Sequence, residues 1–234
     1  MPFRPYHRFA NCKRLEGLVN TLRESEDITD DAYGNFHRYH PAMIHKLRSA
    51  KYQLDGLIDK LTSTDIQDAA DPTGNFMFEV NMFIDGFFYS SGSSLDILAR
   101  IVLTLFGEPL TGNIYFQTAH ARLNQNRPGD LLLSRLANPP WRAMFSDYRN
   151  TLTHELILAS RYQIEIDASG GQPSSKIVFP LPDDPRAVPE ARKYKRNPDV
   201  ANYAKTHLVR VLSLANQIYG DIAGRAESSG ALPL

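Results

Sequence analysis

The sequence predicts an all-α fold with one β-hairpin inserted near residues 161–180. Apolar residues recur at three- and four-residue steps over most of the chain, which is the spacing of one face of a helix. Prolines and glycines delimit several of these periodic stretches. The segment RYQIEID departs from the pattern, because its apolar and polar side chains alternate as they do in a strand.

The helical segments follow one another along the chain with short breaks. We expect Pro41 to open the first of them, because proline is tolerated in the first turn of a helix. Gly107 is expected to close the second, and the stretch NRPGD to separate two short helices. The expected helices span about residues 43–61, 76–106, 112–137 (as two short helices), 140–159 and 199–222.

The hairpin is formed by RYQIEID and KIVFPLP, with ASGGQPSS as a loose loop between them. It lies between helices and is too small to be a domain, so we interpret it as an insertion. The expected organisation is a helical extension over residues 1–36, one helical domain over 37–225 and a flexible tail over 226–234.

The amino-acid composition excludes several classes of protein and site. Lys and Arg number 26, and so do Asp and Glu, so any binding to nucleic acid needs a local basic patch. The single cysteine, Cys12, excludes an intrachain disulfide and a cysteine zinc cluster. Charged residues interrupt the longest apolar stretch, which excludes a membrane span. These features predict a soluble, cytoplasmic protein.

The stretch DYRNTLTHE, residues 147–155, lies in the expected helix 140–159. On a helical wheel Tyr148 belongs to an apolar stripe, whereas Asn150 and His154 fall on nearly the opposite side. That opposite face also carries small or apolar residues and has no Lys or Glu. We therefore expect a second helix to pack against it, either from the same chain or from a second copy. The stripe comprises Trp141, Phe145, Tyr148, Leu152 and Leu156, and the opposite face Ala143, Ser146, Asn150, Thr153, His154 and Ile157.

These side chains fit proton transfer beside a phosphodiester. An imidazole exchanges protons near neutral pH, so His154 is the candidate acid or base. Arg149 is a fixed cation that suits phosphate oxygens, and Asn150 is placed to orient the imidazole. Attack by a 2'-hydroxyl needs both a base and an acid, and one histidine supplies only one of them. Two copies of the helix about a two-fold axis would supply both.

The segment RNTLTH resembles the signature of the HEPN superfamily, in which an arginine and a histidine are separated by four to six residues and a polar residue follows the arginine. Arg149, Asn150 and His154 match it position by position, and the helical pattern over about residues 40–222 agrees. The resemblance implies a compact helical bundle and a metal-independent endoribonuclease without a cofactor. It also implies a composite site in a homodimer and a role in toxin–antitoxin or antiviral defence systems, with an antitoxin or other partner protein. The hairpin and the last long helix depart from the family pattern.

Three acidic residues are candidates for a supporting role. Asp85 and Asp96 share one face of the expected helix 76–106, and either is placed to pair with Arg149 or to orient His154. The alternative is that both are buried salt-bridge partners without a role in catalysis. Glu155 falls within the apolar stripe, where it is expected to pair with an arginine inside the bundle.

A basic run could contact RNA, with Tyr194 available for base stacking and a solvated surface as the alternative. The run comprises Arg192, Lys193, Lys195 and Arg196. Another cluster, His37, His40 and His45, is not expected to bind a metal, because Pro41 interrupts its helical register.

Two other functions remain open. One is a noncatalytic HEPN-like module that binds a nucleotide, an RNA or a partner protein, and the more distant one is a helical metal-dependent hydrolase. The chain carries neither a Walker motif nor a Gly-x-Ser-x-Gly elbow, which argues against P-loop and α/β-hydrolase chemistry.

Overall fold

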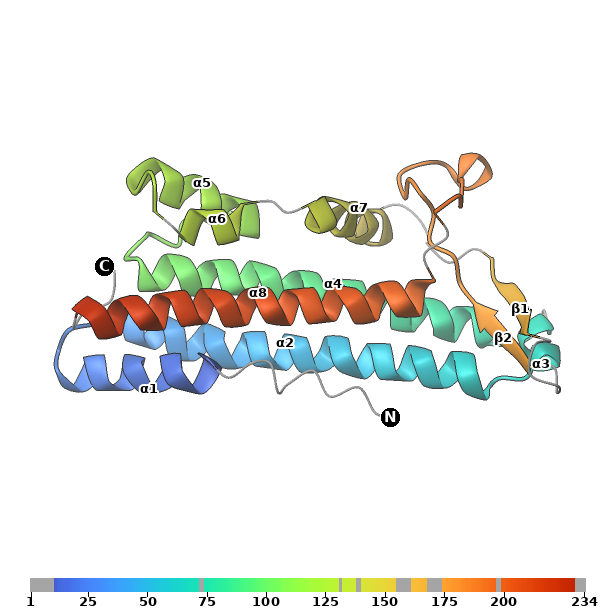
Figure 1. The fold of residues 1–234 in the computed structure, drawn as a ribbon, viewed down its shortest axis with the longest axis horizontal. Coiled ribbons are helices and arrows are strands. Elements are labelled where there is room, and N and C mark those ends of the chain that lie inside the picture. The colour runs from blue at the N-terminus through green and yellow to red at the C-terminus, as the bar shows by residue number, and fades with distance from the viewer. Residues whose placement is uncertain are drawn as a thin grey trace. The chain divides into compact units, whose positions relative to one another are not determined.

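The computed structural model describes residues 11–71, 74–130, 132–137, 140–154, 161–167, 174–196 and 199–229. The described chain is mostly helical, with one two-stranded antiparallel hairpin, which confirms the predicted all-α class with an inserted hairpin (Figure 1). The helices are α1 (Asn11–Glu24), α2 (Asp30–Ser63), α3 (Ile66–Ala70), α4 (Phe76–Leu105), α5 (Phe116–Asn126), α6 (Leu132–Leu136), α7 (Pro140–His154) and α8 (Val200–Ser229). The strands are β1 (Gln163–Asp167) and β2 (Ser174–Val178), and a short 3-10 turn covers Pro189–Ala191.

The prediction that Pro41 opens a helix is wrong, because α2 begins at Asp30 and contains Pro41 in its interior. An interior proline removes one backbone hydrogen bond and costs about 3 kcal/mol. The apolar stripe nevertheless continues upstream of it, and Phe36 and Met43 are both almost fully buried. Burial on both sides of the proline therefore offsets the local cost. As a result α2 runs without a break through residues 36 and 37, where the helical domain was expected to begin.

The other predicted helices lie close to their expected positions. Helix α4 ends where Gly107 adopts a positive φ of 69°, and α5 and α6 are the two short helices on either side of NRPGD. Helix α8 is longer than expected and reaches Ser229, with Ala226 buried and Glu227 paired with Arg14. The expected tail is thus helical over residues 226–229.

The chain divides into two compact units. Unit 1 comprises Met1–Leu47, Ser91–Pro139 and Leu208–Leu234, and unit 2 comprises Arg48–Ser90 and Pro140–His207. Each unit contains part of α2, α4 and α8 and buries its own apolar core. The unit 1 core includes Phe36, Met43, Val102, Phe116, Leu212 and Ile218, and the unit 2 core includes Leu54, Val80, Phe88, Phe145, Tyr148 and Phe179.

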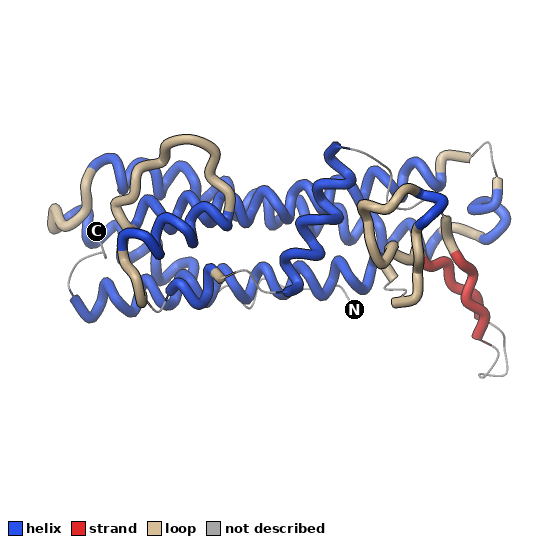
Figure 2. Tube along the Cα trace, turned by 90° about the horizontal axis from the view of Figure 1, so that it is seen from above, coloured by secondary structure: helices blue, strands red, loops and turns tan. Residues whose placement is uncertain are grey.

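In unit 2, α2 and α4 approach closely at Gly56. A Cβ atom at this position would overlap the ring of Phe83, so a larger residue would force that ring to move. The hairpin, red in Figure 2, pairs Gln163 with Val178 and Ile164 with Ile177. Of these residues only Ile177 and Val178 are buried, so β2 packs on the unit 2 core and β1 faces solvent.

No helix in the described part of the chain combines the length and hydrophobicity that a membrane crossing requires.

Candidate functional site

Helix α7 belongs to unit 2 and buries the predicted apolar stripe only in part. Phe145 and Tyr148 are fully buried, whereas Trp141 and Leu152 are half-buried and Leu156 lies outside the described residues. The Phe145 ring stacks on His207 with centroids 3.7 Å apart and planes 4° from parallel. His207 is therefore a core residue of the α7–α8 contact.

The described side chains on the opposite face of α7 are exposed or half-buried. Asn150 and Ala143 are exposed and Ser146 is half-buried. His154 ends the helix, and its side chain lies outside the described part of the structure. Because residues four apart lie on the same face, the helical backbone places position 154 beside Asn150. We expected a helix of the same chain or of a second copy to pack on this face. No helix in the described part of the chain buries Asn150, so the face remains available to a second copy or a ligand.

The segment over residues 179–196 is attached to the buried side of α7. The Tyr148 hydroxyl donates a 2.7 Å hydrogen bond to the Pro182 carbonyl. Burial raises the pKa of Tyr148 and the nearby Asp183 carboxylate raises it further, so the hydroxyl stays protonated and remains a donor. Asp183 in turn accepts the backbone N–H groups of Lys195 at 2.9 Å and Arg196 at 3.0 Å. These bonds position the basic run beside α7.

Arg192 does not fit the predicted role in RNA binding. Only 7 % of the residue is exposed, and its guanidinium donates to the carbonyls of Ala187 (3.2 Å) and Pro185 (3.5 Å). The loop has little regular structure, so its buried carbonyls need side-chain donors. The prediction for Arg192 is therefore wrong, because the side chain stabilises the loop that carries its neighbours.

The rest of the basic run is exposed and gains an arginine that the sequence did not single out. The Arg161 guanidinium lies 3.5 Å from the centre of the Tyr194 ring, so it covers one ring face that was expected to be free for base stacking. Arg161 is itself exposed. No sequence signal linked it to Tyr194, since 32 positions separate the two. We call the exposed cations of this surface the basic loop face; they are Arg161, Lys193, Lys195 and Arg196.

The structure describes two of the three supporting acidic candidates. Asp96, in unit 1, accepts the backbone N–H of Phe116 at 3.4 Å, at the start of α5. Asp85, in unit 2, is exposed, so the prediction that it forms a buried salt bridge is wrong. Partial desolvation still raises the pKa of its carboxyl. Glu155 lies outside the described residues, and Arg149 is half-buried.

A second open face of unit 2 is apolar. Phe78, Met82 and Tyr89 project from α4 with exposed fractions of 65, 56 and 55 %. We call these three residues the α4 stripe. Large apolar residues exposed together on one helix are a feature of protein contact surfaces, so this stripe competes with α7 as a dimer contact.

Of the histidines His37, His40 and His45, only His40 contributes to the core of unit 1. His40 is buried, with Nδ1 3.0 Å from the Tyr219 hydroxyl and Nε2 3.3 Å from the Cys12 sulfur. Burial raises the pKa of Cys12 to about 11, so the thiol is protonated at neutral pH and is a poor nucleophile. Among the described residues, no group of His, Cys, Asp or Glu is arranged to hold a metal ion.

No protein-family model, curated protein or solved structure matches the chain. The candidate site therefore depends on the RNTLTH segment and on the geometry of unit 2: an open face of α7 that carries Asn150, with the basic loop face held against the same helix.

Proposed function

We propose that the chain is a metal-independent endoribonuclease of the HEPN type that acts as a homodimer. One observation carries the proposal: Asn150 is exposed on its face of α7 in the described part of the chain, and the segment that carries Lys195 and Arg196 is attached to the same helix. An inert polar network between helices would instead bury Asn150 within the subunit.

In the proposed reaction His154 of one protomer removes the proton of a 2'-hydroxyl, and the oxygen attacks the adjacent phosphorus. The imidazolium of the second protomer's His154 protonates the departing 5'-oxygen. The two Arg149 guanidinium groups stabilise the charge that develops on the phosphate oxygens. The products are a 2',3'-cyclic phosphate and a 5'-hydroxyl, and no metal or cofactor takes part.

The basic loop face is the proposed path of the RNA strand. Lys195 and Arg196 are exposed, and neither has a carboxylate partner in the described part of the chain. A few cations suit a short single-stranded contact, which agrees with the zero formal net charge of the whole chain. The proposed cellular setting is a toxin–antitoxin or defence system in which a partner protein controls the enzyme.

The test is cleavage of RNA by the purified protein in excess EDTA. We expect 2',3'-cyclic phosphate ends, and we expect His154→Ala to lower the rate about 10²- to 10⁴-fold, which is the usual contribution of general acid–base catalysis. His45→Ala is the matched control, because His45 is exposed on α2, and it is expected to keep full activity. Light scattering checks that both variants keep the oligomeric state of the wild type.

Retention of activity in His154→Ala would contradict the proposal. RNA binding without cleavage by the wild type would instead favour the noncatalytic HEPN-like module.

A further inference from the structure

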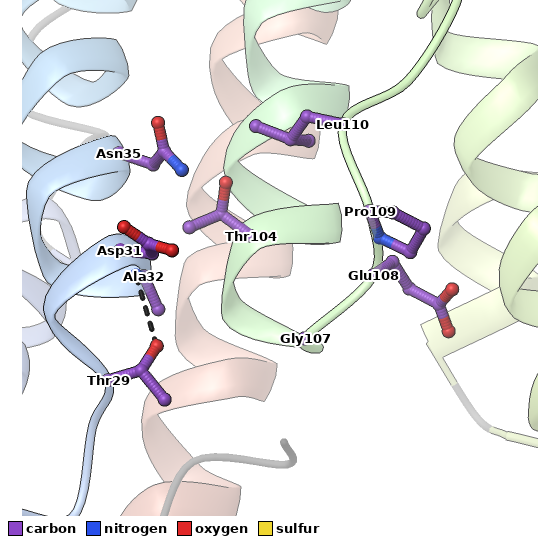
Figure 3. A pocket seen from close by; sticks show the side chains of 9 residues that line it. All are labelled: Thr29, Asp31, Ala32, Asn35, Thr104, Gly107, Glu108, Pro109 and Leu110. Atoms are coloured by element: carbon purple, nitrogen blue, oxygen red, sulfur yellow. Dashed lines mark hydrogen bonds between the residues drawn. The ribbon is translucent and has the colours of Figure 1, made fainter.

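Unit 1 contains a pocket of about 410 Å³ between the beginning of α2 and the end of α4 (Figure 3). This volume is within the range of sites that bind small molecules. The polar side chains that line it include Asp31 and Asn35 from α2, Thr104 from α4 and Glu108 from the loop that follows. No motif in the sequence pointed to this place, because about 70 residues separate the two sides of the pocket.

Thr104 provides the first indication of a ligand. It is only 4 % exposed, and its hydroxyl has no hydrogen-bond partner in the part of the chain that the structure describes. Figure 3 shows this hydroxyl pointing into the pocket toward the side chain of Asn35. Buried hydroxyls are nearly always hydrogen-bonded, and a threonine in a helix usually bonds the preceding turn. A bound polar group would provide the missing partner.

The charge of the lining favours a cation. Asp31 and Glu108 are acidic, and the pocket has no Lys, Arg or His among its lining residues. The neighbouring Asp30 is neutralised by Arg23 at 2.5 Å, whereas Asp31 has no ion pair among the described residues. The Glu108 carboxylate accepts one hydrogen bond, from Asn126 at 2.7 Å.

The remaining lining is Thr29, whose hydroxyl accepts the backbone N–H of Ala32 at 3.2 Å, and apolar surface that comes mainly from the turn after α4. Gly107, with φ of 69°, reverses the chain so that Pro109 and Leu110 form one wall, and Ala32 lies on the α2 side. A ligand with a short hydrocarbon chain between polar ends would match this mixture of acceptors and apolar surface.

We propose that the pocket binds a small aliphatic amine. The ammonium group contacts the carboxylate of Asp31 and the oxygens of Asn35 and Thr104, and the methylene chain lies along Pro109 and Leu110. The proposal does not depend on ribonuclease activity, because its test measures binding to the unit 1 pocket in the absence of RNA.

The test compares three four-carbon probes by titration calorimetry on the full chain: putrescine, 1,4-butanediol and succinate. We expect saturable one-to-one binding of putrescine and none of the neutral diol or the dianion. Asp31→Asn is expected to weaken putrescine binding at least about tenfold, the effect of losing one charge-assisted hydrogen bond. Asp59→Asn removes an exposed carboxylate elsewhere on α2 and is expected to leave the Kd unchanged.

Thr104→Val separates a role in binding from a role in folding. Valine keeps the shape and removes only the hydroxyl, so we expect weaker putrescine binding by about fivefold to tenfold with no loss of thermal stability. Equal binding of the diol, equal Kd values for wild type and Asp31→Asn, or no saturable binding of putrescine would overturn the proposal. So would a Thr104→Val variant that melts earlier but binds normally, because the hydroxyl would then serve folding alone.

Discussion

The hydroxyl of Tyr148 donates a 2.7 Å hydrogen bond to the carbonyl of Pro182, and both residues are buried. The bond links α7 to the loop that carries Lys195 and Arg196, one residue away from Arg149. A core tyrosine thus fixes the separation between the candidate catalytic helix and the cations proposed to bind RNA.

Replacement of Tyr148 by Phe is expected to lower both stability and RNA affinity. The Pro182 carbonyl would remain buried without a donor, at a cost of about 1–3 kcal/mol in the free energy of unfolding. Urea denaturation measures this change, and a titration with single-stranded RNA measures the affinity. Tyr52→Phe is the control, since Tyr52 is 72 % exposed and its loss should cost less than about 0.5 kcal/mol. Equal stability of wild type and Tyr148→Phe would show that the bond does not hold the loop.

Within the basic run, substitutions of the exposed cations and of the buried Arg192 are expected to have different effects. Lys195→Ala and Arg196→Ala should each weaken RNA binding and reduce the slope of log Kd against log salt by about 0.7, with little effect on stability. Arg192→Ala should instead destabilise the fold by about 1–3 kcal/mol, because it leaves the carbonyls of Ala187 and Pro185 without donors. The check is a salt series of RNA titrations beside denaturation curves. A stable Arg192→Ala with impaired RNA binding would reverse the assignment.

The proposed dimer contact can be tested with cysteines. In a Cys12→Ser background, Asn150→Cys is expected to form a disulfide-linked dimer on mild oxidation, because symmetric packing of α7 brings the two positions together. Disulfides need Cα atoms within about 7 Å. Met82→Cys, on the exposed α4 stripe, serves as the comparison. Efficient cross-linking at 82 and none at 150 would mean dimerisation through α4, and the composite catalytic site would then be untenable.

The pair Asp130–Arg225 in unit 1 is expected to stabilise the fold in a pH-dependent way. Two hydrogen bonds of 2.6 Å join the groups, and the guanidinium holds the pKa of the Asp130 carboxyl below its usual value. A folded pKa below the unfolded one gives stability at neutral pH that disappears as pH falls through the folded value. Asp130→Asn should therefore cost about 1.5–3 kcal/mol at pH 7, and much less once the pH falls below the lowered pKa of the folded state.

The more exposed pair Arg135–Asp221 provides the control for this pH series. Its nitrogen–oxygen distance is 3.2 Å, and Asp221→Asn should cost less than about 1 kcal/mol. Unfolding curves at several pH values give the change in the free energy of unfolding for both variants. If Asp130→Asn lowered this free energy by the same amount at every pH, the stabilisation would not come from the ionised Asp130 carboxylate.

The positions of most helices follow from the sequence because they are determined by residues close together in the chain. The period of apolar residues places α4, α5, α6 and α7, and Gly107 ends α4 with the backbone angle that glycine allows. The hairpin was likewise predicted from alternation and from its loop residues. Pro41 shows the limit of local reasoning, since its unfavourable place inside α2 is decided by how well Phe36 and Met43 are buried.

The sequence by itself determined the helical class, the hairpin and the spacing of Arg149, Asn150 and His154 along one helix. Only the tertiary structure decided that Asn150 is exposed, that Arg192 is buried while Lys195 is exposed, and that Arg161 stacks on Tyr194. It also decided that Thr104 and Asn35 meet at one pocket. The reason is physical: helix formation depends on neighbours within a few positions, whereas burial and side-chain pairing depend on segments that the fold brings together from far apart.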